Sequence, residues 1–335
     1  MADEPLLEVT DLSVEFPTDD GVVHAVDRVS YSLAEGETLG IVGESGSGKS
    51  VTSLAILGLL PKRAKVTGSV RFLGRELIGM KDNEMRRLRG RNIAMVFQDA
   101  LTSLNPVIRV GDQIAEAITA HRVISKHDLS ARVIKLLELV GIPNPAERAN
   151  QYPHEYSGGM RQRALIAMMI ANEPDVLIAD EPTTALDVTI QAQVLEVLER
   201  IKQRTSSAIV LITHDLGVIA GVADRVLVMY AGRQVELGTA DDIFYLPRHP
   251  YTEGLLASLP RLDRRSGSER LHRIKGQPPS LLALPPGCAF NPRCPHAKHK
   301  SCDGPRPELV AIGRGAHLSA CLRVDEIYAE AQESS

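Results

Sequence analysis

The sequence predicts an α/β protein with a core of parallel strands, and two observations lead to this prediction. Continuous apolar runs at residues 176–179 and 208–213 are typical of strands that are buried on both faces of a parallel sheet. Helical apolar spacing is found at residues 110–141 and 158–172. Because strands alternate with helices, we expect an α/β core with helical insertions.

The N-terminal part of the chain alternates between apolar and polar residues. This pattern predicts strands with one buried face, at residues 7–10, 12–16 and 26–33. A polar turn at residues 18–21 separates the second strand from the third. The apolar strand at 38–42 then runs directly into a glycine-rich loop, and residues 50–60 predict a helix that Pro61 ends.

Composition places the chain among ordinary globular proteins. It has 335 residues, 38 Lys and Arg against 42 Asp and Glu, and 44% hydrophobic residues, which excludes collagen-like and disordered chains. No apolar run reaches the roughly 18 residues that cross a bilayer, and the N-terminus lacks the segments of a signal peptide. The absence of a basic block argues against binding to nucleic acid. We therefore expect a cytosolic protein, which could still dock on a membrane protein.

The amino-acid composition changes near residue 260. Residues 261–286 are charged and rich in proline, and they lead into a tail that holds all four cysteines. We expect two domains, a core at 1–260 and a C-terminal extension at 261–335. There is no internal repeat, so the chain carries one copy of the core.

The glycine-rich loop carries the first functional motif. Residues 43–50 read Gly-Glu-Ser-Gly-Ser-Gly-Lys-Ser, which matches the phosphate-loop pattern G-x-x-x-x-G-K-[ST]. Glycines let several backbone N–H groups point at one phosphate chain, and the following helix adds its positive N-terminal end. Lys49 can reach the outer phosphates, and the Ser50 hydroxyl can bind Mg²⁺. The sequence therefore predicts a nucleotide site.

Polar residues elsewhere supply further parts of a hydrolytic site. Asp180 and Glu181 end an apolar strand, where Asp180 can hold the Mg²⁺ shell and Glu181 can polarise the attacking water. Ser157 can cap a helix that begins with Gly158 and Gly159, whose backbone N–H groups can face an anion. Three further polar side chains follow apolar stretches on separate loops: Gln98, Asp187 and His214.

With these motifs in this order, residues 6 to about 250 resemble the ATP-binding-cassette (ABC) ATPases. The resemblance implies a fold with a RecA-like core, an antiparallel β subdomain and a helical signature subdomain. It implies a Q-loop glutamine at Gln98, the signature Ser157-Gly158-Gly159, and a D-loop at Ala185-Leu186-Asp187. It also implies Glu181 as the catalytic base and His214 as the switch histidine. The signature departs from the commonest form, with Tyr156 for Leu and Met160 for Gln.

The resemblance also implies a full set of site residues. The catalytic residues would be Glu181, His214, Lys49 and Gln98, and the Mg²⁺ ligands Ser50, Gln98 and Asp180. An aromatic residue stacks on adenine in this family, and Phe16 is the candidate, with Tyr31 as an alternative that is better explained as a strand residue. The ATP-binding set would be Phe16, Gly43, Glu44, Ser45, Gly46, Ser47, Gly48, Lys49, Ser50, Val51, Gln98, Ser157, Gly158, Gly159, Asp180, Asp187 and His214.

In this family two cassettes pair head to tail, and the signature of one covers the ATP held by the other. Two stretches, 97–106 and 249–252, are similar to the ATPase subunits of dipeptide and oligopeptide importers, as are residues 181–193 and the cysteine tail. That branch implies a second, different ATPase subunit, two permease subunits and an extracytoplasmic binding protein. It places the chain at the cytoplasmic face of the cell membrane. Nickel import, a soluble ABC ATPase off the membrane and a non-hydrolysing module are the alternatives.

The cysteines Cys288, Cys294, Cys302 and Cys321 are not spaced as C-x₂-C, so spacing identifies no metal. Four thiolates suit tetrahedral Zn²⁺ or a [4Fe–4S] cluster. Unrelated core cysteines and disulfides are the other interpretations. In a zinc site a histidine could replace one thiolate, and the candidates are His296, His299 and His317. The resemblance to peptide importers favours the [4Fe–4S] cluster, as a structural staple for a short tail.

Overall fold

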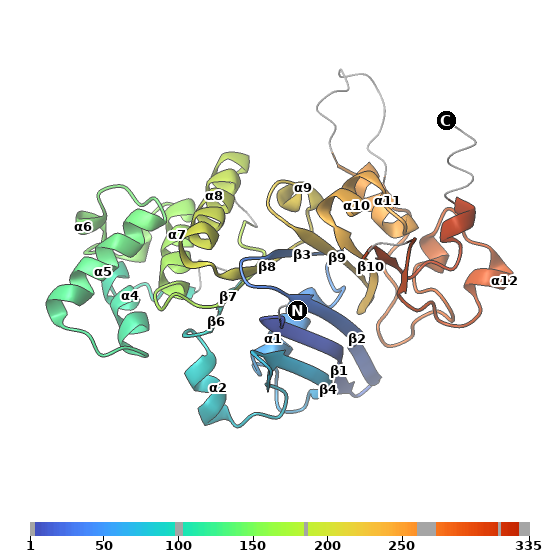
Figure 1. Cartoon of the computed structure of the whole chain (residues 1–335), viewed down its shortest axis with the longest axis horizontal. Helices are drawn as coiled ribbons and strands as arrows, with labels where there is room; N and C mark the ends of the chain where they lie inside the picture. The colour runs from blue at the N-terminus through green and yellow to red at the C-terminus, as the bar shows by residue number, and fades with distance from the viewer. Residues whose placement is uncertain (1–3, 98–102, 184–186, 260–272, 314–315, 328–335) are drawn as a thin grey trace, which may run out of the picture. The chain divides into compact units, whose positions relative to one another are not determined.

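The computed structural model describes residues 4–97, 103–183, 187–259, 273–313 and 316–327. The chain folds into two compact units, whose elements are labelled in Figure 1. The first unit is built mainly from Phe72–Ile212. The second contains Glu8–Ser32, Leu39–Arg71 and the residues from Thr213 onward.

The first unit contains three parallel strands, β6 (Ile93–Val96), β7 (Val176–Asp180) and β8 (Ala208–Thr213). β7 lies between the other two, with Val176 opposite both Ile93 and Ala208. Every residue of the three strands is buried, as expected for strands that are covered on both faces. The strands predicted at 176–179 and 208–213 are thus confirmed. The short β5 (Arg75–Glu76) also belongs to this unit.

The helices of the first unit include a group, α4 to α7, that gathers beside the strands (Figure 1). The helical spacing at 110–141 is confirmed, and the chain forms two helices within this stretch. Ser125 accepts a hydrogen bond from the Asp128 N–H and so begins a new helix. The helices of the unit are α2 (Asp82–Leu88), α4 (Val110–Thr119), α5 (Lys126–Leu139), α6 (Pro145–Arg148), η1 (Pro153–Glu155), α7 (Gly158–Met169) and α8 (Val188–Thr205).

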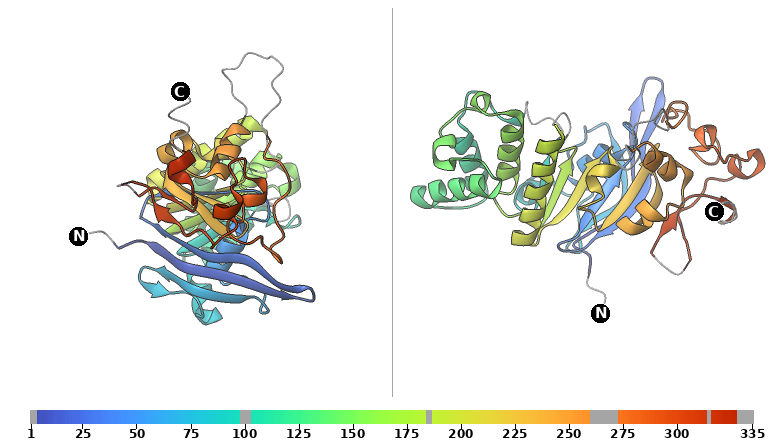
Figure 2. Two further views of the ribbon diagram at one scale, coloured as in Figure 1. Left: turned by 90° about the vertical axis from the view of Figure 1, so that its right-hand side faces the viewer. Right: turned by 90° about the horizontal axis from the view of Figure 1, so that it is seen from above.

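The second unit begins with the long strands β1 (Leu7–Thr18) and β2 (Gly21–Leu33), with β4 (Lys65–Phe72) beside β1 (Figure 2). The Thr18 hydroxyl donates to the Gly21 carbonyl at 2.8 Å and closes the predicted turn. The two strands predicted at 7–10 and 12–16 form one strand instead. Asp11 takes a left-handed conformation (φ +48°) within it, as at a β-bulge, and its N–H donates to the Ser30 hydroxyl at 2.8 Å.

A second set of strands in this unit has the order β11-β12-β10-β9-β3. β3 (Thr38–Val42) pairs in parallel with β9 (Arg225–Tyr230), and β10 (Arg233–Thr239) pairs antiparallel with β9. The C-terminal strands β12 (Leu318–Ser319) and β11 (Val310–Ala311) extend this order from β10. The C-terminal extension therefore forms part of the same sheet as the core strands.

The helices of the second unit include α1, which begins at the predicted phosphate loop. α1 ends at Ile56, earlier than the predicted end at residue 60, because Gly58 adopts a left-handed conformation and its N–H bonds to the Ala55 carbonyl. The helices are α1 (Lys49–Ile56), α9 (Leu216–Ile219), α10 (Ala240–Tyr245), α11 (Pro250–Ala257), η2 (Asn291–Arg293) and α12 (His299–Cys302).

Candidate nucleotide site

The predicted phosphate loop connects β3 to α1 in the second unit, and its glycines are required by the close approach of other backbone segments. A Cβ on Gly43 would lie 2.1 Å from the Met229 carbonyl oxygen, and one on Gly48 would lie 2.4 Å from the Ala25 carbonyl oxygen. Both glycines also have positive φ angles. No other residue type fits these two positions, so the loop is built as its motif predicts.

Lys49 lies inside this loop and is 5% exposed. Its Nζ donates to the Gly43 carbonyl at 2.6 Å and to the Glu44 carbonyl at 3.0 Å, and lies 3.4 Å from the Ser47 Oγ. Ser50 and Val51 follow in the first turn of α1, where backbone N–H groups lack partners within the helix. The loop therefore surrounds an ammonium group with oxygens that phosphate oxygens could replace.

The predicted carboxylates occupy the end of β7 in the first unit. Asp180 is the last residue of the strand and is 4% exposed. Glu181 follows with φ +47°, and its N–H donates to the Ile212 carbonyl at 2.9 Å. A left-handed backbone at a non-glycine residue stores about 1–2 kcal/mol of strain, and such strain collects at functional sites. The end of β7 and the hydrogen bond to β8 thus fix the position of the Glu181 backbone, from which its side chain extends.

The predicted signature forms the N-terminus of α7. Ser157 caps the helix by accepting a hydrogen bond from the Met160 N–H at 3.3 Å, and both Ser157 and Gly158 are exposed. Gly159 is buried, and a Cβ on it would lie 2.5 Å from the Ile190 Cγ2. The divergent Tyr156 is 3% exposed and donates its hydroxyl to the Arg148 carbonyl. Tyr156 is therefore a buried packing residue. The departure from the commonest signature at this position leaves the exposed Ser157 and Gly158 at the tip of α7 unchanged.

Two more predicted residues have clear positions. Asp187 caps α8 by accepting a hydrogen bond from the Ile190 N–H at 3.0 Å, a structural role that sequence reasoning missed. His214 directly follows β8 and is exposed. Gln98 lies outside the described residues, as do Ala185 and Leu186 of the predicted D-loop.

The two candidates for adenine stacking differ in burial. Phe16 is half-buried near the end of β1. Tyr31 is 5% exposed within β2, and burial strongly raises the pKa of its hydroxyl. A tyrosine that is packed into the core cannot present its ring to a nucleotide, so Tyr31 is a strand residue and Phe16 stays the prediction.

Known proteins share these features. The family model described as ABC transporter matches residues 26–184, and the model described as oligopeptide/dipeptide transporter, C-terminal region, matches residues 235–302. The dipeptide transport ATP-binding protein DppD of Bacillus subtilis is 57% identical over 325 residues, which are 96% of this chain and 96% of DppD. This chain is an ABC transporter ATPase.

Further relatives agree with this assignment. The oligopeptide transport ATP-binding protein OppD of Salmonella typhimurium is 51% identical to this chain over 323 residues. The alignment covers 96% of this chain and 95% of OppD. A solved structure described as dimeric MJ0796, a bacterial ABC transporter cassette, matches with a TM-score of 0.63 and 26% identity. It covers 70% of this chain and 98% of the cassette. The predicted cassette fold is confirmed.

The four cysteines of the ABC transporter ATPase gather around one cavity of about 20 Å³, which His249 and His296 also line. The Cys288 N–H donates to the Cys302 carbonyl at 3.0 Å. Burial raises the pKa of Cys294 to about 12 and of Cys321 to about 11, and the neighbouring cysteines add to both shifts. The chain therefore brings four thiols together at one cavity, and burial favours the protonated form of Cys294 and of Cys321.

The cysteines are free rather than disulfide-bonded, and their shared cavity argues against four unrelated core cysteines. Among the residues that the structure describes, no group of three or more His, Cys, Asp or Glu side chains is arranged to hold a metal ion. His317 does not line the cysteine cavity, and its Nε2 lies 2.7 Å from the Glu236 Oε1 instead. The side chain of His299 lies outside the described part of the chain. Within the described ranges, no helix is both long and apolar enough to cross a membrane.

Proposed function

We propose that this ABC transporter ATPase hydrolyses ATP to power the import of dipeptides or oligopeptides. The observation that carries the proposal is the match of residues 235–302 to the C-terminal region of oligopeptide/dipeptide transporters. This region follows residues 26–184, the part that the general ABC transporter model matches, so it distinguishes one branch from the others. The half-buried Glu181 at the end of β7 and the buried Lys49 of the phosphate loop are the residues that we expect hydrolysis to need.

The proposed residue roles come from side-chain chemistry and from the resemblance to ABC ATPases. Lys49 and the backbone of residues 43–51 hold the phosphates, and Asp180 and Ser50 hold Mg²⁺ together with Gln98. Glu181 orients and polarises the attacking water, and His214 stabilises the charge that develops on the transferred phosphoryl group. A Mg²⁺ ion held by these residues would supply positive charge against the phosphates. Phe16 stacks on adenine.

We further propose that a second, different ATPase subunit completes the site. The exposed Ser157 and Gly158 at the tip of α7 support this, because an exposed helix N-terminus can approach an anion held by a partner. Asp187 lies at the same kind of surface, exposed at the start of α8. Two permease subunits and an extracytoplasmic binding protein complete the importer, with this chain at the cytoplasmic face of the membrane. A core at 1–260 and an extension at 261–335 remain our proposed domains.

The test is co-purification of the chain from native membranes, followed by identification of its permease and binding protein. The assembled importer is then reconstituted, and its ATPase rate is measured with the binding protein, with and without short peptides. We expect peptides to raise the rate and Ni²⁺ to leave it unchanged. Stimulation by Ni²⁺ alone would show a nickel importer, and purification without any membrane subunit would show a soluble ABC ATPase.

We propose that Cys288, Cys294, Cys302 and Cys321 hold a [4Fe–4S] cluster, with zinc as the alternative. The proposal is supported by the position of the four cysteines, which line one cavity from different segments of the extension. A bound cluster would supply a structural crosslink for a tail with little core of its own. Because the thiols must lose protons to bind iron, retention of metal should fall as the pH is lowered.

Anaerobic purification followed by iron and zinc analysis tests this proposal. We expect about four irons per chain in the wild type and strongly reduced iron in Cys294→Ser. Stoichiometric zinc without iron would support the alternative, and neither metal in the anaerobic protein would contradict both.

A further inference from the structure

The C-terminal extension contacts the phosphate loop through one arginine. Arg293 ends the short helix η2, directly before Cys294. Its Nη1 lies 2.5 Å from the Glu44 Oε2, and its Nη2 donates to the Glu44 Oε1 at 2.9 Å. Glu44 is the second residue of the phosphate loop. The contact is therefore a two-pronged ion pair between segments that are far apart in the sequence.

All three guanidinium nitrogens of Arg293 contact polar groups of neighbouring residues. It is 5% exposed, its Nε donates to the Lys275 carbonyl at 3.0 Å, and its Nη1 lies 3.3 Å from the Tyr230 Oη. Its guanidinium also lies 5.7 Å from the centre of the Tyr230 ring. The hydrogen bonds to Glu44 raise the pKa of Arg293 above its usual value. An arginine fixed in this way can hold its partner in one position.

Glu44 in turn has all its polar groups engaged. Its N–H donates to the Tyr251 Oη at 2.8 Å, and its carbonyl accepts from the Lys49 Nζ at 3.0 Å. Tyr251 is fully buried, with its ring 4.6 Å from that of Tyr230 and 5.3 Å from that of Phe290. Thus an aromatic cluster and Arg293 together fix the residue that touches Lys49.

We propose that Arg293 is a positioning residue for the ATP phosphates. It holds Glu44, and through Glu44 the start of the phosphate loop, in the shape that receives them. It also neutralises a carboxylate that would otherwise carry its negative charge on the same loop as the triphosphate. The extension is thereby part of the nucleotide site of its own chain. This inference rests on the proposed role of residues 43–50 as the phosphate loop.

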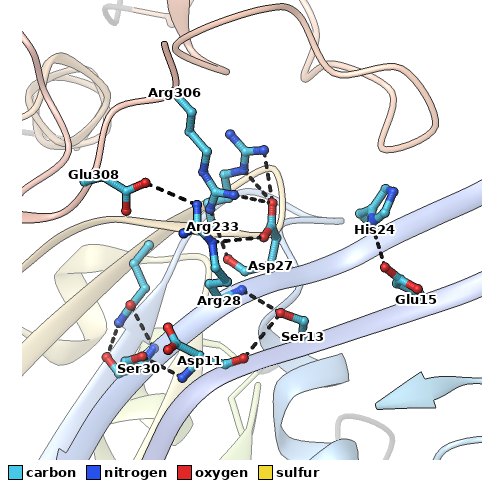
Figure 3. Close-up of polar contacts among 11 residues, drawn as sticks. Asp11, Ser13, Glu15, His24, Asp27, Arg28, Ser30, Arg233, Arg306 and Glu308 are labelled. Carbon is cyan, nitrogen blue, oxygen red and sulfur yellow. Dashed lines mark hydrogen bonds and ion pairs between the residues drawn. The ribbon is translucent and has the colours of Figure 1, made fainter. Parts of the chain in front are cut away.

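The chain offers a matched control in a second arginine of the extension. Arg306 pairs with Asp27 of β2 at 2.7 Å, and Arg233 pairs with the same carboxylate at 3.0 Å (Figure 3). Nearby, Arg28 reaches Glu308 at 3.2 Å. The pairs of Arg306 with Asp27 and of Glu308 with Arg28 attach the extension to β2. Arg306→Gln therefore loosens the extension without removing the partner of Glu44.

The experiment measures the Kd for ATP of the full chain by competition with a fluorescent ATP analogue. We expect Arg293→Gln to weaken binding about 5- to 20-fold and Arg306→Gln to change it less than about 2-fold. Arg293→Lys keeps the charge and should recover part of the loss. In a Glu44→Gln background, Arg293→Gln should have almost no further effect, since Arg293 acts through that carboxylate.

Three results would overturn the inference. They are a Kd for Arg293→Gln within 2-fold of wild type, an equal loss in Arg306→Gln, and a loss that persists in the Glu44→Gln background. If Arg293→Gln does not fold, the same cycle is measured with Arg293→Lys. In the assembled importer the KM for ATP should rise at nearly constant kcat, and a fall in kcat at constant KM would contradict the role.

Failure of the proposed phosphate loop is distinguishable from failure of this inference. Lys49→Ala is measured in parallel as the reference for the loop itself. If Lys49→Ala binds ATP like the wild type, the proposed loop is wrong. If Lys49→Ala loses binding and Arg293→Gln keeps it, only the role of Arg293 is wrong.

Discussion

Lys49 is the residue on which ATP binding should depend most directly. It is enclosed by oxygens of its own loop, and the phosphates would replace those contacts with charged ones. We expect Lys49→Ala to abolish the thermal stabilisation by ATP, which in the wild type reaches about 2.7 kcal/mol at 100 times Kd. Differential scanning fluorimetry checks this, with the exposed Lys62→Ala as the control. An unchanged shift in Lys49→Ala would contradict the assignment.

Glu181 should matter for turnover and not for binding. Glu181 follows β7 and is not part of the glycine loop at residues 43–50, whose backbone we expect to hold the phosphates. We expect Glu181→Gln to lower the ATPase rate at least about 100-fold, because the amide cannot accept a proton from water. ATP binding should stay within a few-fold of wild type, as measured by the same competition assay.

Glu196→Gln is the control for Glu181, since Glu196 lies on α8 with 69% of its side chain exposed. It should keep the wild-type rate. A near wild-type rate in Glu181→Gln would mean that another group activates the water.

At the scale of elements, the junction of α7 and α8 depends on Gly159. The Ile190 Cγ2 lies 2.5 Å from where a Cβ would be, so Gly159→Ala must displace Ile190 or the tip of α7. Overpacking of this kind costs about 1–3 kcal/mol. We expect Gly159→Ala to lower the free energy of unfolding by that amount, as measured in urea.

A second substitution, Ile190→Ala, tests whether the cost of Gly159→Ala comes from the clash with Ile190. Ile190→Ala removes the methyl group that would clash, so Gly159→Ala should cost less in that background. If both backgrounds lose the same stability, contact between these two helices does not explain the requirement for glycine.

The elements also show where local signals succeed. β7 and β8 were predicted correctly because every residue in them is buried, so a continuous apolar run is the direct consequence of a parallel sheet. Both halves of the stretch 110–141 show helical spacing, and the structure divides the stretch into α4 and α5. The break depends on the cap at Ser125, a weaker local signal.

At the scale of the whole molecule, one carboxylate joins the C-terminal extension to the N-terminal strands. Asp27 pairs with both Arg233 and Arg306, and these contacts lower the pKa of Asp27 despite its burial (Figure 3). Asp27→Ala leaves two arginines without this acceptor, at a cost of about 2 kcal/mol. We expect faster hydrogen exchange at residues 303–313 and easier proteolysis there.

Lys298→Ala is the control for this effect. Lys298 pairs with Glu326 within the extension, and both side chains are more than half exposed. Pairs of this kind contribute about 0–1 kcal/mol. Hydrogen exchange at residues 303–313 should therefore stay unchanged in Lys298→Ala. An effect equal to that of Asp27→Ala would mean that the ion pairs of Asp27 do not specifically hold the extension against β2.

Residues 43–50, the strand that ends at Asp180 and the cap at Ser157 could all be found in the sequence by itself. Each of these signals is local, because glycine spacing, a buried apolar run or a capping residue determines the backbone conformation within a few positions. The pairing of Arg293 with Glu44 and the gathering of four cysteines at one cavity were decided by the tertiary structure. Such contacts join distant segments whose meeting depends on the path of the entire chain, and no short-range pattern encodes that path.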